Sequence, residues 1–218
     1  MELKKQKTYK TVFEIARDAL VASDYLRQCA QAGLKCAEET GGSTIQVPYF
    51  NEIITIHIPR FSFESSKNAN VTLVTRIILL HYINNASGIP LSGEKVAYGD
   101  IPSCIHYEPV FAKRALKPLQ NAFGHDKYAF LEAGLALGGK EEEYGDTSFT
   151  LFAFPKVPIT FILWEGDEEF PPSMKALFDP SITGYLSLED IVVIAKLAAS
   201  RILKTAHKQH IDETGDDA

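Results

Sequence analysis

Apolar positions in the N-terminal part of the chain change from helical spacing to alternation. Over residues 8–37 they recur every three or four positions, which predicts one long helix that ends at Gly41 and Gly42. Residues 43–48 and 52–58 then have strand patterns, and in the second segment isoleucines alternate with threonine and histidine. We therefore expect a helix followed by two strands, with a turn at residues 49–51.

The rest of the chain predicts more helices and one apolar hairpin. Helical spacing returns at about residues 70–84, 108–122 and 127–137, and 96–98 is a short candidate strand. Residues 147–154 and 159–164 are apolar at successive positions, as in strands with both faces covered, so this hairpin should be central. Ser187 is placed to cap a last helix that runs to about residue 204. These elements predict an α+β fold: a small, mainly antiparallel sheet of four to five strands packed with five to six helices.

Composition limits the domain organisation and the partners. The chain has 218 residues, of which 45% are hydrophobic and 23% charged, enough for one buried core. We expect a single domain over residues 1–206 and a disordered acidic tail over 207–218. The net charge of −6 disfavours nucleic acid and anionic membranes as partners. No apolar run approaches the roughly 20 residues of a membrane span, and no signal peptide is recognisable, so we expect a cytoplasmic protein.

The three cysteines do not form a recognisable motif. Cys29, Cys36 and Cys104 are an odd number without C-x-x-C spacing, which predicts neither a disulfide framework nor a structural zinc site. Cys29 and Cys36 fall two turns apart on the predicted first helix. We interpret them as small buried apolar residues.

Four carboxylates lie within five residues at the end of the second hairpin strand, directly after Trp164. Asp146, Asp167 and Glu168 are candidate ligands for a hard divalent cation or candidate acid–base groups, and a carboxylate partly desolvated beside Trp164 would have a raised pKa. However, adjacent residues of an extended segment point in alternate directions, and the spacing matches no calcium loop. We therefore favour a structural role: one carboxylate caps a short helix after the double proline, and the core contains Phe170, Leu177 and Phe178.

His81 is the most interesting histidine for ligand binding. It shares a helical face with Val74, Ile77 and Ile78, so its side chain should point toward the core or a cavity. A buried neutral imidazole can bind iron, cobalt or zinc or carry a proton; the structural alternative is a core histidine bonded to a backbone carbonyl. The candidate ligand-binding residues are His81, His106, Tyr107 and Trp164. Glu189 and Asp190, in contrast, suit the first turn of a helix, and we assign them no chemistry.

Four segments of the chain resemble a known family. They are LLHYINNASGIPLSGEKVAYGDIP (79–102), YEPVFAKRALKPLQNAFG (107–124), GDTSFTLFAFPKVPITFILWEGDEEFPPSMKALFD (145–179) and YLSLED (185–190). Together they resemble the prokaryotic DUF3786 family, a domain without a known function. The resemblance implies one fold unit over nearly the whole chain and a setting in anaerobes with corrinoid and one-carbon metabolism. Some relatives carry a cysteine-rich iron–sulfur module; this sequence departs from them because it has no such cysteines, so the resemblance does not imply an electron-transfer role.

Three functional hypotheses follow. The first is a ligand-binding or accessory protein for a metal-containing or tetrapyrrole ligand such as haem or a corrinoid. The second is a small enzyme that uses the acidic segment for acid–base or metal chemistry, and the third is a module that binds a protein partner. We rank binding first, because the sequence contains no G-x-S-x-G elbow and no phosphate-binding glycine loop.

Overall fold

The computed structural model describes residues 2–215, and the side chains of residues 7–209. The chain divides into two compact units, each assembled from three separate segments. Unit 1 comprises the chain up to Ser92 together with Phe154–Val157 and Ser181–Asp190. Unit 2 comprises Gly93–Ala153, Pro158–Pro180 and the chain from Ile191 onward. From the sequence we had expected one domain over residues 1–206, whereas the structure alternates between two units along that length.

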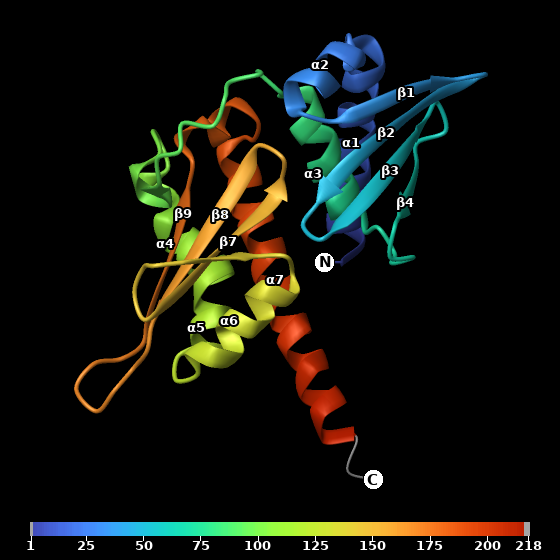
Figure 1. Cartoon of the computed structure of the whole chain (residues 1–218). Coiled ribbons are helices and arrows are strands. Elements are labelled where there is room, and N and C mark those ends of the chain that lie inside the picture. Colours follow the sequence, from blue (N-terminus) through green and yellow to red (C-terminus); the bar gives the residue numbers. More distant parts are fainter. Residues whose placement is uncertain (1, 216–218) are drawn as a thin grey trace. The chain divides into compact units, whose positions relative to one another are not determined.

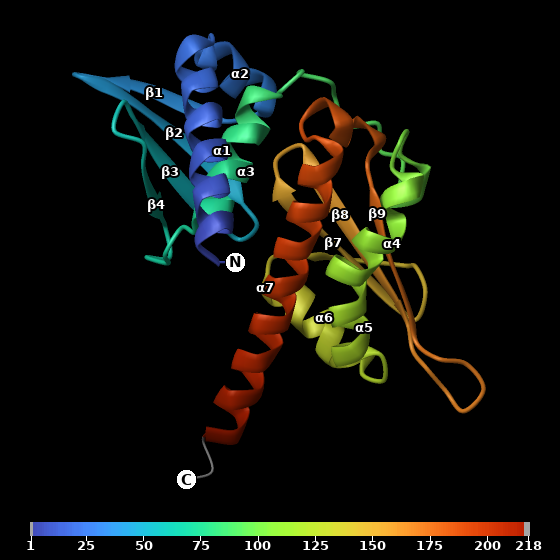
Figure 2. The same cartoon turned by 180° about the vertical axis from the view of Figure 1, so that it is seen from behind.

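Unit 1 is a four-stranded antiparallel sheet with helices on one face (Figures 1 and 2). Its strands are paired in sequence order: β1 (Lys35–Glu39), β2 (Gly42–Tyr49), β3 (Glu52–Ile58) and β4 (Ser62–Ser65). Its helices are α1 (Glu2–Ala22), α2 (Tyr25–Ala32) and α3 (Leu73–Asn84). Ile45 and Ile56 are paired in register and both fully buried, while their polar neighbours Gln46 and Thr55 face the other way. This alternation is the pattern from which β2 and β3 were predicted.

The single helix expected over residues 8–37 is wrong. Asp24 starts a new helix, because its side chain accepts a hydrogen bond from the Arg27 N–H at 3.1 Å. Gly33 ends α2 in the left-handed region at φ +72°, with the paired backbone hydrogen bonds of a Schellman turn. The chain then enters β1, which places Cys36 on a strand. The chain reverses because Gly33 adopts a left-handed conformation, and the apolar periodicity did not predict that conformation.

Unit 2 is built on a five-stranded antiparallel sheet. Its strand order is β5 (Val96–Ala97), β9 (Ser173–Phe178), β8 (Val157–Trp164), β7 (Thr147–Phe154) and β6 (Lys140–Glu142). Its helices are α4 (Glu108–Phe111), α5 (Lys117–Phe123), α6 (Lys127–Ala136) and α7 (Leu188–Gly215) from Ile191 onward, while the first residues of α7, up to Asp190, belong to unit 1. A π-helical turn (Ala112–Leu116) lies between α4 and α5. The helices α5 and α6 lie on one face of the sheet (Figure 2). The predicted α+β class with antiparallel sheets of four to five strands is confirmed, with two such sheets in place of one.

The predicted apolar hairpin is at the centre of this sheet. β8 is the middle strand, and Phe161 and Leu163 have no exposed surface. Phe152 is the exception on β7, with half of its surface exposed. The hairpin is therefore central, as its apolar composition predicted.

Three expectations for the C-terminal third are corrected. The segment after Pro171 and Pro172 is the strand β9, not a helix, and Phe170 is 67% exposed instead of buried. Phe178 is fully buried as expected, in edge-to-face contact with two other aromatic rings of unit 2. The helix α7 continues to Gly215, past residue 206, where we had expected a disordered tail to begin. Residues 216–218 lie outside the described residues.

Candidate histidine–carboxylate site

Helix α3 presents His81 from a firmly packed position in unit 1. Its neighbour Tyr82 is fully buried and stacks on Phe154 with the ring centroids 4.3 Å apart. The Tyr82 hydroxyl donates a hydrogen bond to the Ala32 carbonyl at 2.7 Å and accepts one from the Lys156 N–H at 3.2 Å. These contacts hold α3 against α2 and the 154–157 turn, so the backbone that carries His81 is fixed.

Helix α7 presents a carboxylate from its first turn. Ser187 precedes the helix, and its hydroxyl oxygen accepts a hydrogen bond from the Asp190 N–H at 3.2 Å. This confirms the cap predicted from the sequence. The same hydroxyl donates to Asp190 Oδ2 at 2.7 Å, so it also holds the carboxylate in place.

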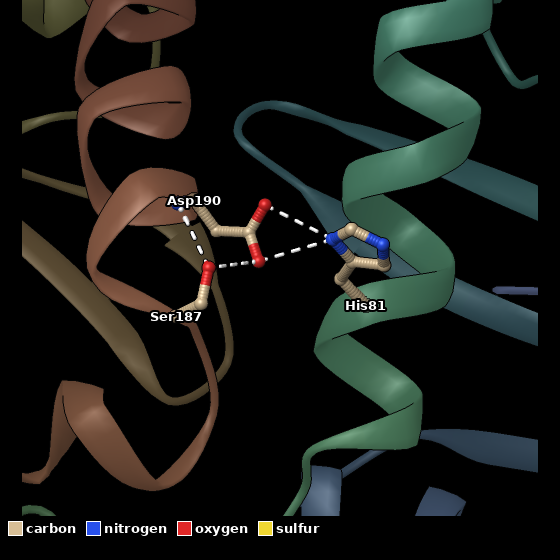
Figure 3. A network of polar contacts seen from close by, with 3 residues as sticks. All are labelled: His81, Ser187 and Asp190. Carbon is tan, nitrogen blue, oxygen red and sulfur yellow. Dashed lines mark hydrogen bonds and ion pairs between the residues drawn. The ribbon is translucent and has the colours of Figure 1, made fainter. Parts of the chain in front are cut away.

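The Asp190 carboxylate contacts His81 (Figure 3). His81 Nδ1 lies 3.0 Å from both carboxylate oxygens, and Asp190 is only 7% exposed. Because a carboxylate accepts hydrogen bonds, Nδ1 is the nitrogen that carries the proton. In a neutral imidazole the lone pair is then on Nε2, which has no hydrogen-bond partner within the described residues. The His81 side chain keeps 26% of its surface exposed, so its ring is not sealed in a core.

Asp190 is the functional candidate that the sequence did not reveal. Its position in the first turn of a helix explained the carboxylate fully, and we had assigned it no chemistry. His81 and Asp190 are 109 positions apart, so only the fold brings them together. The structural alternative for His81, a hydrogen bond to a backbone carbonyl, does not occur at Nδ1, which has a carboxylate partner instead.

The other predicted ligand-binding residues belong to unit 2. His106 and Tyr107 lie in the short 3-10 helix Ile105–Tyr107, and both are exposed. Trp164 is the last residue of β8 and is half-buried. That any of these three residues shares a ligand with His81 stays a prediction.

The acidic residues near Trp164 stabilise a turn. The Asp167 carboxylate accepts hydrogen bonds from the backbone N–H groups of Glu169 and Phe170, at 2.8 and 2.7 Å. These bonds hold the pKa of Asp167 below its usual value, which is the opposite of the raised pKa expected beside Trp164. Asp146 accepts a hydrogen bond from the Glu165 N–H at 2.8 Å, and Glu168 is exposed. Among the side chains that the structure describes, no group of three His, Cys, Asp or Glu residues is gathered to hold a metal ion.

A shallow depression of about 220 Å³ lies beside Asp146, between α6 and the 141–147 segment. Two of the residues that line it are in ion pairs: Lys127 with Glu165 at 3.3 Å, and Glu142 with Lys95 at 2.9 Å. The hydrogen bonds to Lys95 and to Thr150 keep the pKa of Glu142 below its usual value. These carboxylates therefore serve unit 2 as ion-pair partners.

A comparison with protein-family models matches residues 24–201 to a domain of unknown function, DUF3786. The chain belongs to the DUF3786 family. The matched region is most of the chain and contains His81, Ser187 and Asp190, so the whole histidine–carboxylate site lies inside the DUF3786 domain. Searches of the curated proteins and of the solved structures found no match. Within the described residues, no helix is both long and apolar enough to cross a bilayer.

Proposed function

We propose that this DUF3786 protein binds a metal-containing small molecule and that His81 Nε2 is the protein's ligand to the metal. The observation that supports this proposal is the pair of 3.0 Å contacts between His81 Nδ1 and Asp190. A histidine that ligates a metal commonly donates its other N–H to a carboxylate, which fixes the tautomer and the ring orientation and makes the free nitrogen more basic. Asp190 is in turn held by Ser187 and by the start of α7.

The chemistry of a single imidazole favours a metal that already has other ligands. In haem and in corrinoids the macrocycle supplies four nitrogens, and one axial histidine nitrogen from the protein is sufficient to attach the metal. His81 and Asp190 fit this requirement, because they offer one oriented, unpaired nitrogen. When bound, such a group would supply the metal-centred chemistry, and this chain would hold the His81 ring so that Nε2 faces the metal. We include in the proposal a cytoplasmic location and a small-molecule ligand.

The same pair also favours a second candidate, an enzyme that uses His81 Nε2 as a general base. A carboxylate on Nδ1 stabilises the imidazolium that forms when Nε2 takes up a proton. This candidate replaces the enzyme we had considered on the acidic segment, where backbone hydrogen bonds occupy Asp167. The two candidates differ in what binding changes: a metal ligand alters the absorption spectrum of the bound metal, and a general base does not.

Absorption titrations of anaerobically purified protein test the proposal, with haemin and aquocobalamin as separate probes. We expect one of them to bind at micromolar concentration with shifted bands, and His81→Ala to weaken binding at least tenfold and abolish the shift. His57→Ala is the matched control, because His57 is also in unit 1 and lies 3.4 Å from a carboxylate, that of Glu64. It should bind like the wild type.

A second pair of variants tests whether the Asp190 carboxylate acts by orienting His81 or only through its negative charge. Relative to the wild type, Asp190→Asn should weaken binding and change the absorption bands, but both effects should be smaller than those of His81→Ala. The reason is that the imidazole ring remains while its tautomer is no longer fixed. Glu64→Gln, which changes the control pair in the same way, should have no effect. If neither probe binds, or if His81→Ala binds with unchanged bands, the metal-ligand proposal fails. The general-base candidate and the protein-partner hypothesis would then remain.

A further inference from the structure

Two cysteines of unit 1 meet where α2 turns back into β1. Cys29 lies in the last turn of α2, and Cys36 is the second residue of β1. The turn between them is fixed by the left-handed Gly33 and by a hydrogen bond of 2.8 Å from the Leu34 N–H to the Cys29 carbonyl. This turn replaces the continuous helix on which the two residues would have been two turns apart.

The side chains of Cys29 and Cys36 influence each other's pKa, and neither cysteine is in a disulfide. Cys36 is paired in register with the fully buried Ile45, so its side chain is on the face of the sheet that the helices cover. Cys29 is 1% exposed, whereas Cys36 is half-buried. Cys36 is therefore the more accessible of the two thiols to a small reagent, and Cys29 is the less accessible.

We propose that Cys29 and Cys36 are an oxidation site that closes an intramolecular disulfide with a low-molecular-weight disulfide, R–S–S–R, as the oxidant. The Cys36 thiolate attacks one sulfur of the reagent, forming a mixed disulfide and releasing one R–S⁻. The Cys29 thiolate then attacks the Cys36 sulfur, forming the Cys29–Cys36 bond and releasing the second R–S⁻. Two electrons pass from the protein to the reagent, and the two thiol protons end on the released thiols or in solvent.

The surroundings of the pair set the pH dependence of this reaction. Burial raises the pKa of Cys29 to about 12 and raises that of Cys36 as well, each from the ordinary value of 9.0. For Cys36, the hydrogen bond from Cys29 opposes this effect. Because only the thiolate attacks, the reaction is slow at neutral pH and accelerates as the pH rises. The negative charge of Glu38 also raises the pKa of Cys36, as burial does.

The bond would join the end of α2 to the edge strand β1. A cross-link of this kind removes freedom from the unfolded chain, so the oxidised protein should have a higher thermal unfolding midpoint, by a few degrees. Of the two elements joined, α2 contacts α3 directly, through the hydrogen bond from Tyr82 to Ala32. Oxidation would therefore stiffen the part of unit 1 that supports His81, without using a residue of the candidate site.

The experiment oxidises the folded protein with glutathione disulfide at pH 8.5, removes the reagent, and counts thiols after unfolding. The wild type starts with three thiols, and we expect only that of Cys104, which is fully buried, to remain. Trypsin cleaves after Lys35, so the disulfide should be found as peptide 28–35 joined to peptide 36–60. Cys104→Ser should lose both of its thiols, and Cys36→Ser should keep both.

Three results would overturn the proposal. One is survival of all three thiols in the folded protein with loss only after unfolding, which would mean that the sulfurs cannot approach. Another is a stable mixed disulfide of Cys36 with glutathione, and the third is a disulfide between two chains. Rate measurements from pH 7 to 9 complete the test, because a rate that does not rise with pH contradicts attack by the thiolates of Cys36 and Cys29.

Discussion

Removing one oxygen atom from Tyr82 should destabilise the protein out of proportion to the size of the change. In Tyr82→Phe the ring keeps its place on Phe154 and leaves no cavity, so only the two hydrogen bonds of the hydroxyl are lost. The hydroxyl is a reliable donor, because burial raises the pKa of Tyr82 and keeps it protonated at neutral pH. The substitution therefore isolates the polar link between α3, α2 and the 154–157 turn.

The size of the stability loss follows from the two backbone groups that lose their hydrogen bond to the Tyr82 hydroxyl. Ala32 is fully buried, and its carbonyl is in the last turn of α2, where the helix offers carbonyls no internal partner. An unsatisfied buried group costs roughly 1–3 kcal/mol. Lys156 is half-buried, so its N–H can be rehydrated at a smaller cost. We expect the free energy of unfolding to fall by about 2 kcal/mol.

Urea unfolding followed by circular dichroism measures this loss. Tyr25→Phe is the matched control: its hydroxyl, also in unit 1, lies 3.0 Å from the Ser43 hydroxyl, but Tyr25 is only half-buried. Its loss should be under about 1 kcal/mol. Equal losses for the two variants, or a Tyr82→Phe loss below about 0.5 kcal/mol, would refute the view that the Tyr82 hydroxyl holds α3 in place.

Further predictions concern unit 2 and the connection between the units. A glycine-to-alanine change inside a helix normally stabilises it by about 1 kcal/mol. Gly134→Ala should instead lower the thermal midpoint, because the added methyl group would overlap the buried ring of Phe149. A raised midpoint would contradict this. Glu142→Gln should cost about 1 kcal/mol at pH 7. The pKa of Glu142 is lowered from 4.5 by the bond to Lys95, so this difference should be lost as the pH falls through the lower folded value; a difference independent of pH would argue against the ion pair. Fluorescence of Trp164, the single tryptophan, and circular dichroism should report one unfolding transition, since β7, β8 and α7 each have residues in both units; separate midpoints would show that the units unfold independently.

Local patterns in the sequence were enough to predict the elements whose signals are short-range. The β7–β8 hairpin follows from a run of apolar residues, and the start of α7 follows from Ser187 as its cap. The break between α2 and β1 was missed, because residues 8–37 keep helical spacing while Gly33 adopts a conformation that the pattern does not encode. The strand β9 was missed although Met174, Ala176 and Phe178 alternate with less buried residues, because we expected the double proline before it to start a short helix.

The candidate site was half predictable. His81 could be found because a histidine on an apolar helical face is unusual, but its partner could not, because a carboxylate in the first turn of a helix already has a local explanation. The tertiary fold gives Asp190 its second partner. The acidic residues were overvalued for the opposite reason: a cluster in sequence suggested a site, whereas the backbone N–H groups of the turn occupy Asp167.

The most direct measurement for the central claim is long-range ¹H–¹⁵N correlation NMR of the histidine side chains, with His81 assigned by comparison with His81→Ala. In the free protein we predict that His81 carries its proton on Nδ1 and its lone pair on Nε2. On addition of the diamagnetic ligand, aquocobalamin or ferrous carbonyl haem, the Nε2 resonance should shift while Nδ1 stays protonated and His57 does not change. A proton on Nε2 in the free protein, or ligand binding that leaves both His81 nitrogens unchanged, would contradict the assignment of His81 as the metal ligand.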